Sequence, residues 1–462
     1  MNSKLKRSRN RARFTWMLGL TILGLSGCLE ERKLIWSPDG TRAAVIVPGS
    51  GLRLTDAKGT ITPVLVPDAI DLAWAPDSRS AAVILRHSFA SWKEALPSVP
   101  EAEARQVERE AGKTWERLQS GADWKKLSGE IAGFPNVQVC LRDAHAAEIK
   151  ARFPDVWKSV QNSTVNLHTL VSGALTDLGI DLPVTLRRGL GEIGQIRISP
   201  SGGVLVYEYG SPFTDDPSQG VGMFVAPLQG ATGASIVDRV ASGRDWTPDG
   251  RSLVYARAAG DYDDHAPNHL GEIVVREVID GKGAIAVSKE ARSLAGIVLD
   301  SNVRVRCLRD GRILFNAVEV CFPLLASDFG SQREQLFALD PDRVSTLIRL
   351  IPRWAEAGSA ESQESFEPSP DGRQVLFSGE KGEVDLLTIS TGKWEQVQAA
   401  SKNEGGVTPC WKRDGEFTYA KRAEEGTPAA KERPLEIVVR AGKNETILSS
   451  GWSDSLLQSF VK

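Results

Sequence analysis

The chain of 462 residues has a formal net charge of −3, and 41% of its residues are hydrophobic, a fraction that excludes a disordered chain. Its 43 glycines and 24 prolines suit a fold with many tight turns. The length suggests about three domains, unless one fold is built from internal repeats.

The first 27 residues have the pattern of a signal peptide. Six basic residues between Lys4 and Arg13 precede an apolar stretch, residues 16–25, which is shorter than the roughly 20 residues of a membrane-spanning helix. The next residues, Leu25-Ser26-Gly27-Cys28, resemble the bacterial lipobox. This resemblance implies cleavage before Cys28, a diacylglyceryl group on its thiol and acylation of the new amino terminus. The alternative is an uncleaved anchor helix with a chance cysteine.

Lipidation at Cys28 predicts an extracytoplasmic protein of the bacterial cell envelope, anchored in the membrane by its lipid. Leu29, rather than Asp, follows the cysteine, which favours the outer membrane if the cell is Gram-negative. Without residues 1–27 the chain has 50 basic and 59 acidic residues, a net charge of −9. That charge argues against nucleic acid or anionic lipid headgroups as partners.

Seven copies of a short motif recur after the signal peptide, and an apolar run rich in β-branched or aromatic residues follows each copy. The copies are Trp36-Ser37-Pro38-Asp39-Gly40, Trp74-Ala75-Pro76-Asp77-Ser78, Ile198-Ser199-Pro200-Ser201-Gly202, Trp246-Thr247-Pro248-Asp249-Gly250, Cys307-Leu308-Arg309-Asp310-Gly311, Pro368-Ser369-Pro370-Asp371-Gly372 and Trp411-Lys412-Arg413-Asp414-Gly415. Proline presets the first turn dihedral, Asp or Ser tolerates the next position, and Gly supplies a left-handed residue that closes a hairpin. Each copy therefore predicts a strand–turn–strand unit, and the Trp that opens it suits packing between neighbouring units.

Two further short strand patterns follow most copies, which gives four strands per repeat and predicts an all-β, seven-bladed propeller. The repeats resemble the WD40-like Pro-Asp propeller repeat, as in the C-terminal propeller of TolB and the propellers of some prolyl-oligopeptidase-type enzymes. The resemblance covers most of residues 32–450 and implies fold rather than function, because the motif residues are structural. Copies five and seven have Arg in place of Pro, and copy two has Ser in place of Gly, which leaves their turn types open.

The second and third copies are 124 residues apart, and no further motif lies between them, which predicts an insertion within blade two. Apolar residues at helical spacing predict helices at 101–120, 122–131 and 143–152, with another turn starting at Pro154. We expect Trp115 to pack inside the insertion or onto the propeller. The predicted organisation is a signal peptide at 1–27, the first part of the propeller at 28–87, a helical insertion at 88–162 and the rest of the propeller at 163–462.

The sequence does not decide how the ring of blades closes. Residues 447–449 are a candidate outer strand of blade seven, and the tail at 452–457 is either a packing cap, which we favour, or a partial eighth motif. Cys307 and Cys321 would share a blade, where they either pair or remain thiols. Cys140 and Cys410 fit no metal or redox spacing.

The long connections predicted between second and third strands are 88–162, 210–220, 258–270, 319–332 and 421–433. In a propeller these connections share one face, whereas the motif turns lie on the other, so we expect function on the insertion-bearing face. One of these loops contains Asp263, Asp264, His265 and His269, a candidate metal site whose alternative is a solvated acidic loop.

The chain has five histidines and no nucleophile elbow, catalytic triad or zinc motif, so we assign no catalytic residue and expect no cofactor. The leading hypothesis is a non-enzymatic lipoprotein that binds a protein partner, or another ligand, at the insertion-bearing face. The alternative is a metal-dependent or channel-centred propeller enzyme, a hydrolase or a lyase. The partner, the pathway and the oligomeric state are not specified by the sequence.

Overall fold

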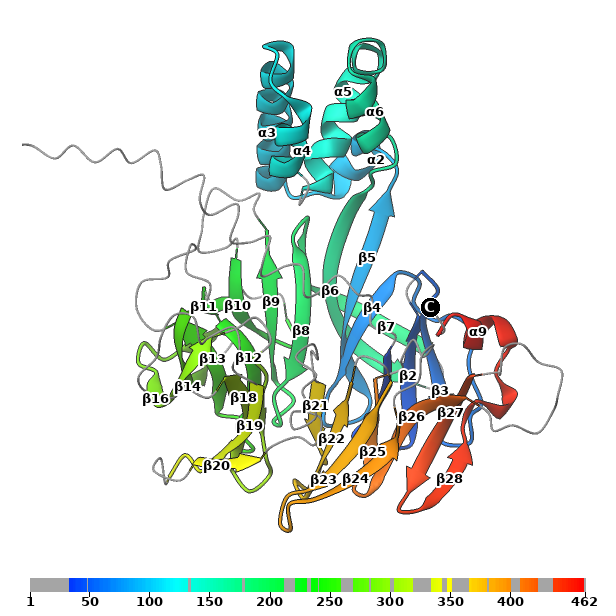
Figure 1. The fold of residues 1–462 in the computed structure, drawn as a ribbon, viewed down its shortest axis with the longest axis vertical. Helices are drawn as coiled ribbons and strands as arrows, with labels where there is room; N and C mark the ends of the chain where they lie inside the picture. The colour runs from blue at the N-terminus through cyan, green and yellow to red at the C-terminus, as the bar shows by residue number, and fades with distance from the viewer. Residues whose placement is uncertain are drawn as a thin grey trace, which may run out of the picture.

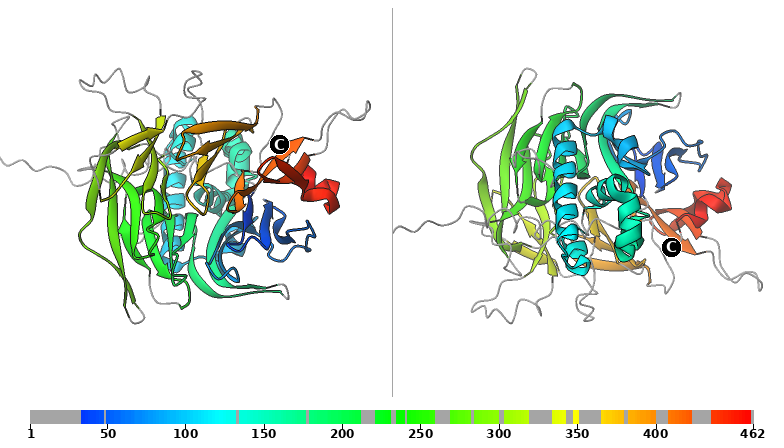
Figure 2. Two further views of the ribbon diagram at one scale, coloured as in Figure 1. Left: turned by 90° about the horizontal axis from the view of Figure 1, so that it is seen from below. Right: turned by 90° about the horizontal axis from the view of Figure 1, so that it is seen from above.

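The computed structural model describes residues 33–460 except 48, 132–133, 177–178, 212–220, 231–233, 240, 259–268, 282–283, 300–302, 319–333, 343–346, 351–364, 380–381, 400–407 and 423–434. The described strands form seven antiparallel sheets in chain order. These blades follow one another around a central axis, so that the first and last lie side by side (Figure 1, Figure 2). The predicted seven-bladed propeller is confirmed.

The strands of the first four blades have the following bounds. Blade one contains β1 (Lys33–Trp36), β2 (Arg42–Val47) and β3 (Gly51–Asp56), and blade two contains β4 (Ala69–Trp74), β5 (Ser80–Phe89), β6 (Val165–Thr176) and β7 (Gly179–Gly189). Blade three contains β8 (Glu192–Ile198), β9 (Val204–Gly210), β10 (Val221–Pro227) and β11 (Ser235–Asp238). Blade four contains β12 (Ala241–Trp246), β13 (Ser252–Ala258), β14 (His269–Gly281), β15 (Ala284–Val287) and β16 (Arg292–Leu299).

The last three blades have four strands each. Blade five contains β17 (Val305–Cys307), β18 (Ile313–Val318), β19 (Glu334–Leu339) and β20 (Leu347–Leu350), and blade six contains β21 (Ser365–Pro368), β22 (Gln374–Ser378), β23 (Val384–Thr388) and β24 (Lys393–Gln398). Blade seven contains β25 (Cys410–Arg413), β26 (Glu416–Arg422), β27 (Leu435–Ala441) and β28 (Asn444–Ile447). Blade one differs from the four-strand pattern, because single bridges at Ile61 and Val66 stand where its outer strand would be.

The motif turns join the first and second strands of every blade, and the register shows where their types diverge. In five copies the first motif residue pairs with the residue seven positions later, as in Trp36 with Ala43. In copies five and seven the interval is six, Cys307 with Ile313 and Trp411 with Phe417. These are the two copies with Arg in place of Pro, so loss of the proline accompanies a hairpin loop shorter by one residue.

The fifth motif residue is left-handed in every copy, and in copies one to four and six it lies against the turn of the preceding blade. Gly40 has φ +67°, and a Cβ there would lie 2.9 Å from the carbonyl oxygen of Lys412 in blade seven. Ser78 takes the same conformation with φ +57°. Its hydroxyl accepts a 3.0 Å hydrogen bond from the Asp39 N–H of blade one. Copy two therefore keeps the turn despite its serine, because the side chain bonds to the neighbouring blade.

Each motif tryptophan fastens its blade to the preceding one through the indole N–H. Trp74 donates to the Ile35 carbonyl at 2.9 Å, and Trp411 donates to the Glu367 carbonyl at 2.8 Å. Trp246 likewise donates to the carbonyl of Arg197 at 3.2 Å. The predicted packing of these rings between neighbouring blades is confirmed. The hydrogen bond from the indole N–H fixes the orientation of each ring.

The ring closes between consecutive blades rather than by exchange of strands, because every blade is built from strands adjacent in sequence. A short 3₁₀ turn, η4 (Ser449–Gly451), and helix α9 (Asp454–Gln458) follow β28. Trp452 and Phe460 share one apolar cluster with strands of blades one and seven. The indole of Trp452 donates to the Gly59 carbonyl at 2.9 Å. The tail is therefore a packing cap and not an eighth motif.

The insertion between β5 and β6 is helical and projects from the face opposite the motif turns (Figure 1). It contains α2 (Trp92–Ala95), η2 (Leu96–Ser98), α3 (Glu101–Gln119), α4 (Trp124–Ile131), α5 (Pro135–Arg152) and α6 (Pro154–Val160). Helix α5 starts eight residues before its predicted start and is kinked at His145, where φ is −131°. No helix within the described ranges is long and apolar enough to cross a bilayer.

Candidate functional site

The base of the insertion is fixed to the propeller by a buried carboxylate. Glu103, near the start of α3, is 5% exposed. One of its oxygens accepts a 2.5 Å hydrogen bond from the Tyr209 hydroxyl on β9, and the other accepts a 2.6 Å bond from the Leu190 N–H. Burial raises the pKa of Glu103. The hydrogen bonds act in the opposite direction but do not outweigh burial. A single side chain thus connects α3 to blades two and three.

Arg187 on β7 completes this junction. Its guanidinium carbon lies 4.0 Å from the centre of the Tyr209 ring, in cation–π geometry. Gly189 lies where no side chain fits, since a Cβ there would be 1.9 Å from the Tyr209 hydroxyl oxygen. The contact is therefore sterically tight as well as polar.

A second anchor holds the two ends of the insertion together. The guanidinium of Arg142 on α5 donates to the Ala90 carbonyl at 2.5 Å, where the chain leaves β5. It also donates to the carbonyls of Gln161 and Ser163 at 3.1 and 2.9 Å, where the chain returns to β6. Asp143 pairs with Arg142 at 2.8 Å and accepts a bond from the Trp92 N–H. One buried arginine therefore joins the two chain segments that connect the insertion to β5 and β6, which we call the stem.

The insertion has a hydrophobic core of its own. Residues of all five helices join one buried cluster, which extends to Val165 and Leu167 at the start of β6. Trp115 lies within it, stacked on His145 with ring centres 4.1 Å apart. The prediction that Trp115 packs inside is confirmed. A core of this kind, joined to anchors at two places, makes the insertion a rigid projection rather than a loose loop.

The residue that immediately precedes each motif holds the same position on the first strand of its blade, and we call these seven residues the channel ring. All seven are partly exposed, and they come from the first strands of the blades. The members are Ile35, Ala73, Arg197, Asp245, Arg306, Glu367 and Cys410. Blades three to six thus contribute alternating positive and negative charges, whereas blades seven, one and two contribute apolar side chains.

The charged half of the channel ring forms one ion-pair network. Arg306 contacts Glu367 at 2.7 Å, and Arg197 contacts both Glu367 at 3.4 Å and Asp245 at 3.7 Å. Because Arg197 belongs to blade three and Glu367 to blade six, the pair spans the axis. Burial opposes ionisation of Glu367, but Arg306 and Arg197 outweigh it and hold its pKa below the usual range.

Arg244 lies beside this network at a bulge in β12 and is only 1% exposed. It pairs with Glu208 on β9 and donates to Gln195 at 3.2 Å. Burial, together with the charges of Arg197 and Arg306, lowers its pKa to about 9. Gln195 has φ +49°, so the backbone is strained where the two blades meet.

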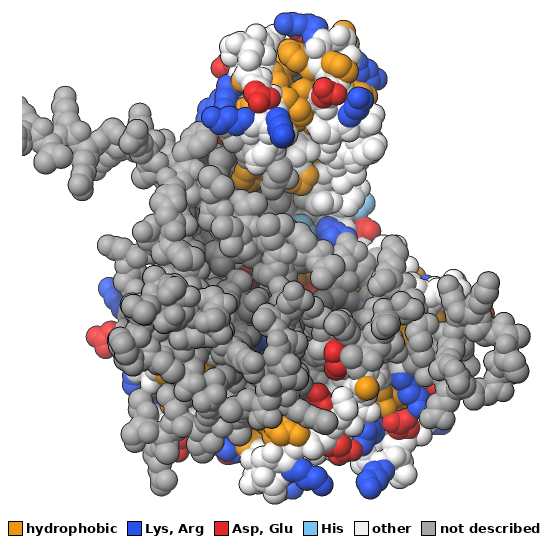
Figure 3. All heavy atoms as spheres, viewed as in Figure 1, with side chains coloured by type: hydrophobic (Ala, Val, Ile, Leu, Met, Phe, Trp, Pro, Cys, Tyr) orange, Lys and Arg blue, Asp and Glu red, His pale blue; other side chains and the backbone are white. Residues whose placement is uncertain are grey.

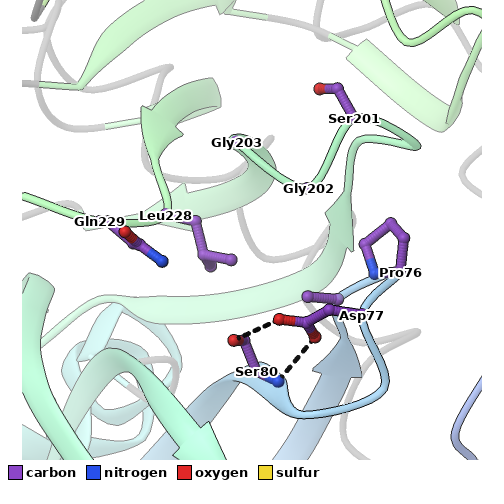
Figure 4. A pocket seen from close by; sticks show the side chains of 9 residues that line it. Pro76, Asp77, Ser80, Ser201, Gly202, Gly203, Leu228 and Gln229 are labelled. Atoms are coloured by element: carbon purple, nitrogen blue, oxygen red, sulfur yellow. Dashed lines mark hydrogen bonds between the residues drawn. The ribbon is translucent and has the colours of Figure 1, made fainter.

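A pocket of about 320 Å³ lies at the opposite face, between the turns of blades two and three (Figure 4). Its single carboxylate, Asp77, accepts bonds from the Ser80 N–H and hydroxyl at 2.8 and 2.7 Å. Both oxygens are thus engaged by the turn itself. The pocket is a by-product of the hairpin and is not on the face where function is expected.

The structure brings the predicted turn residues together as blade hairpins, but it tests neither the lipid nor the metal prediction. Cys28, Asp263, Asp264 and His265 lie outside the described residues, as does Cys321. His269 is described only as the first residue of β14. Within the described ranges no group of three or more His, Cys, Asp or Glu residues could hold a metal ion. Cys140, Cys307 and Cys410 are free thiols.

Sequence reasoning missed the channel ring, although a signal was present. Arg197, Asp245, Arg306 and Glu367 stand at the same position relative to their motifs and alternate in charge from one repeat to the next. Equivalent positions in a closed ring of repeats face one another, so the four charges belong together. Glu103 gives no such signal, because its partners are fixed only by the way α3 docks.

No protein-family model matches the chain, and no curated protein sequence is similar to it. Similar solved structures include the propeller domain of the Trilobed protease from Pyrococcus furiosus, 10% identical, covering 92% of this chain and 99% of that one with a TM-score of 0.45. A protein assigned as TolB from Agrobacterium tumefaciens is 12% identical, covering 57% and 83% with a TM-score of 0.36. An oligogalacturonate lyase in complex with manganese is 15% identical, covering 78% and 77% with a TM-score of 0.42. These likenesses concern the fold alone.

Proposed function

We propose that this protein is a lipid-anchored, extracytoplasmic propeller that binds another protein through the face bearing the helical insertion. The observation that carries the proposal is the rigid mounting of the insertion. It has its own core and is fixed to the propeller by Glu103 and across its stem by Arg142. A preformed projection of this kind loses little conformational freedom when it binds, which favours recognition of a partner.

The proposed cellular location follows from the amino-terminal sequence. Basic residues, an apolar run and Leu25-Ser26-Gly27-Cys28 occur in the order of a lipoprotein signal peptide. More than one acyl chain at Cys28 would give a stable anchor without a basic patch. The cell envelope is therefore the expected compartment, and the outer membrane is favoured if the cell is Gram-negative.

The charges of the channel ring support a binding module over a channel-centred enzyme. Arg197 and Arg306 are both engaged by Glu367, whose pKa is lowered, and a carboxylate of that kind is a poor general acid or base near neutral pH. The network ties blade three to blade six and so stiffens the ring that carries the insertion.

The test is site-specific photocrosslinking in cells that produce the lipidated protein. A photoreactive residue replaces Lys93 on α2, near the base of the insertion, and the matched control replaces Arg309 in the turn of blade five. Both residues are exposed. We expect a discrete protein adduct from position 93 and none from position 309. In a variant whose residues 91–160 are replaced by a short Gly-Ser linker, which lacks position 93, the proteins that co-purify with the natural chain should be lost.

If the linker variant folds and retains every co-purifying protein, the insertion is not the binding site. Stoichiometric metal in the purified protein, measured by elemental analysis, would instead favour the metal-dependent enzyme.

A further inference from the structure

We propose that the outer end of the insertion rests on the bilayer that holds the lipid anchor. This inference rests on the lipidation of Cys28 that belongs to the proposed function. It follows from two lengths and from the chemistry of the insertion's outer end.

The first length is that of the tether. The described chain begins at Lys33, which pairs with Ile46 near the end of β2 that lies away from the motif turn. The insertion leaves blade two from the same end, where Phe89 pairs with Val165. The start of the described chain and the insertion therefore lie on one face. Four residues lie between Cys28 and Lys33, and the five extended steps from one to the other span at most about 17 Å.

The second length is the height of the insertion. Glu103 touches the propeller, and α3 continues outward from it to Gln119. Sixteen residues of α-helix rise about 24 Å. Because the insertion is taller than the tether is long, a bilayer within reach of Cys28 meets the outer end of the insertion before it meets the propeller face around Lys33.

The side chains at that outer end suit the membrane–water interface. Three aromatic side chains of the insertion are only partly buried: Trp124 at the start of α4, Phe153 between α5 and α6, and Trp157 in α6. The ammonium of Lys150 lies 4.2 Å from the centre of the Trp157 ring, and the Arg152 guanidinium lies 5.2 Å from that of Phe153. Figure 3 shows hydrophobic side chains between basic ones at this end of the molecule. Tryptophan flanked by basic residues is typical of chains at the headgroup level.

The charge of the insertion makes zwitterionic lipid the appropriate probe. Residues 88–162 contain 11 basic and 11 acidic side chains, and Arg152 and Lys158 are paired with Glu148 and Asp155. With no net charge, the contact depends on the tether and the aromatic side chains rather than on anionic headgroups. The contact should therefore form on phosphatidylcholine.

The experiment uses full-length, lipidated protein reconstituted into phosphatidylcholine vesicles with a nitroxide on the lipid near the headgroup. A fluorophore is attached at Ser120→Cys, an exposed position at the outer end of α3, or at Arg309→Cys on the opposite face as the matched control. We expect several-fold greater quenching at position 120 than at position 309. A third protein has 15 Gly-Ser residues inserted after Glu30, and there quenching at position 120 should fall toward the control.

Flotation of the vesicles separates this inference from the proposed function. If the protein floats with the vesicles but quenching is equally weak at positions 120 and 309, the anchor stands and the bilayer contact is wrong. If quenching is unchanged by the longer tether, the tether does not set the contact and the argument from length fails. If the protein does not float, lipidation is wrong and the contact falls with it.

Discussion

The indole nitrogen of Trp36 in blade one donates a 2.5 Å hydrogen bond to the hydroxyl of Thr418 in blade seven, 382 residues later in the chain. Both side chains are buried, and the bond joins the first blade to the last. The indoles of Trp74, Trp246 and Trp411 bond to backbone carbonyls of the preceding blade, which any residue could supply. The bond of Trp36 instead requires the side chain of Thr418. Closure of the ring thus has a residue-specific component that mutation can measure.

We expect Trp36→Phe to lower the free energy of unfolding by about 1–3 kcal/mol, because it removes the indole donor from a buried hydrogen bond to the Thr418 hydroxyl. The double variant Trp36→Phe, Thr418→Val should cost less than the sum of the two single changes. Urea unfolding followed by tryptophan fluorescence measures all three. Strict additivity would show that the pair does not interact in solution.

Gly59→Ala should be among the most disruptive glycine substitutions in the described chain. Gly59 has φ +88°, and a Cβ there would lie 1.9 Å from the Leu448 carbonyl oxygen beneath the carboxy-terminal cap. We expect a loss of about 2–5 kcal/mol from conformational strain and overpacking together. Gly392→Ala is the control, since its φ is +63° with open space around it. It should cost only about 1–2 kcal/mol, and equal costs would contradict the close approach.

Glu103→Ala should loosen the insertion without unfolding the propeller. It leaves the Tyr209 hydroxyl and the Leu190 N–H without their acceptor, a loss of about 2–3 kcal/mol in local stability. Hydrogen exchange should quicken in α3 and stay unchanged in blades four to six. Glu101→Ala is the matched control, because the Glu101 side chain is 83% exposed and forms an exposed ion pair with Arg105. If both variants exchange alike, Glu103 is not the anchor.

Stability should decrease as the pH falls from about 6.5 to about 4, because burial, followed by the charge of Arg86, lowers the pKa of His168 from 6.5 to about 4. As the pH falls, the unfolded chain binds a proton at His168 before the folded chain does, which favours unfolding. The neutral His168 therefore contributes no penalty to folded-state stability above pH 6.5, and stability is lost progressively between pH 6.5 and pH 4. The loss is on the order of 3 kcal/mol. Urea unfolding at pH 7 and pH 5 should show a weaker pH dependence for His168→Gln than for the natural chain. Identical slopes would mean that His168 is accessible to protons in the folded state.

Glu367→Gln should destabilise the ring, because it leaves Arg197 and Arg306 facing each other without their shared carboxylate. The Glu367 side chain is 41% exposed, so the cost should lie between those of surface and buried pairs, about 1–3 kcal/mol. Thermal unfolding measures it at low and high salt, and salt should reduce the difference between variant and natural chain. Asp155→Asn, which breaks an exposed pair with Lys158, is the control and should be nearly neutral. A neutral Glu367→Gln would mean that the network contributes nothing to closure.

The sequence by itself determined the repeating unit of this protein. The turn of each blade is fixed by neighbours in the chain, such as Asp249, whose carboxylate accepts bonds from Thr247 and Arg251. The turn at Ser78 was also predicted, because the other residues of that motif copy match the repeat. The helix at 101–120 was predicted to within one residue at its end, since its apolar spacing is also a local property.

Only the tertiary structure decided which of these units meet. Arg197 and Glu367 are 170 residues apart, and their contact exists because a closed ring brings blades three and six to one axis. The docking of Glu103 on Tyr209, the cap over Gly59 and the one-residue shortening of hairpins five and seven likewise arise from packing between separate elements. Local turn chemistry depends on adjacent residues and can be read in order along the chain. Contacts across the ring depend on the angle and register of every blade between them, which no short stretch of sequence contains.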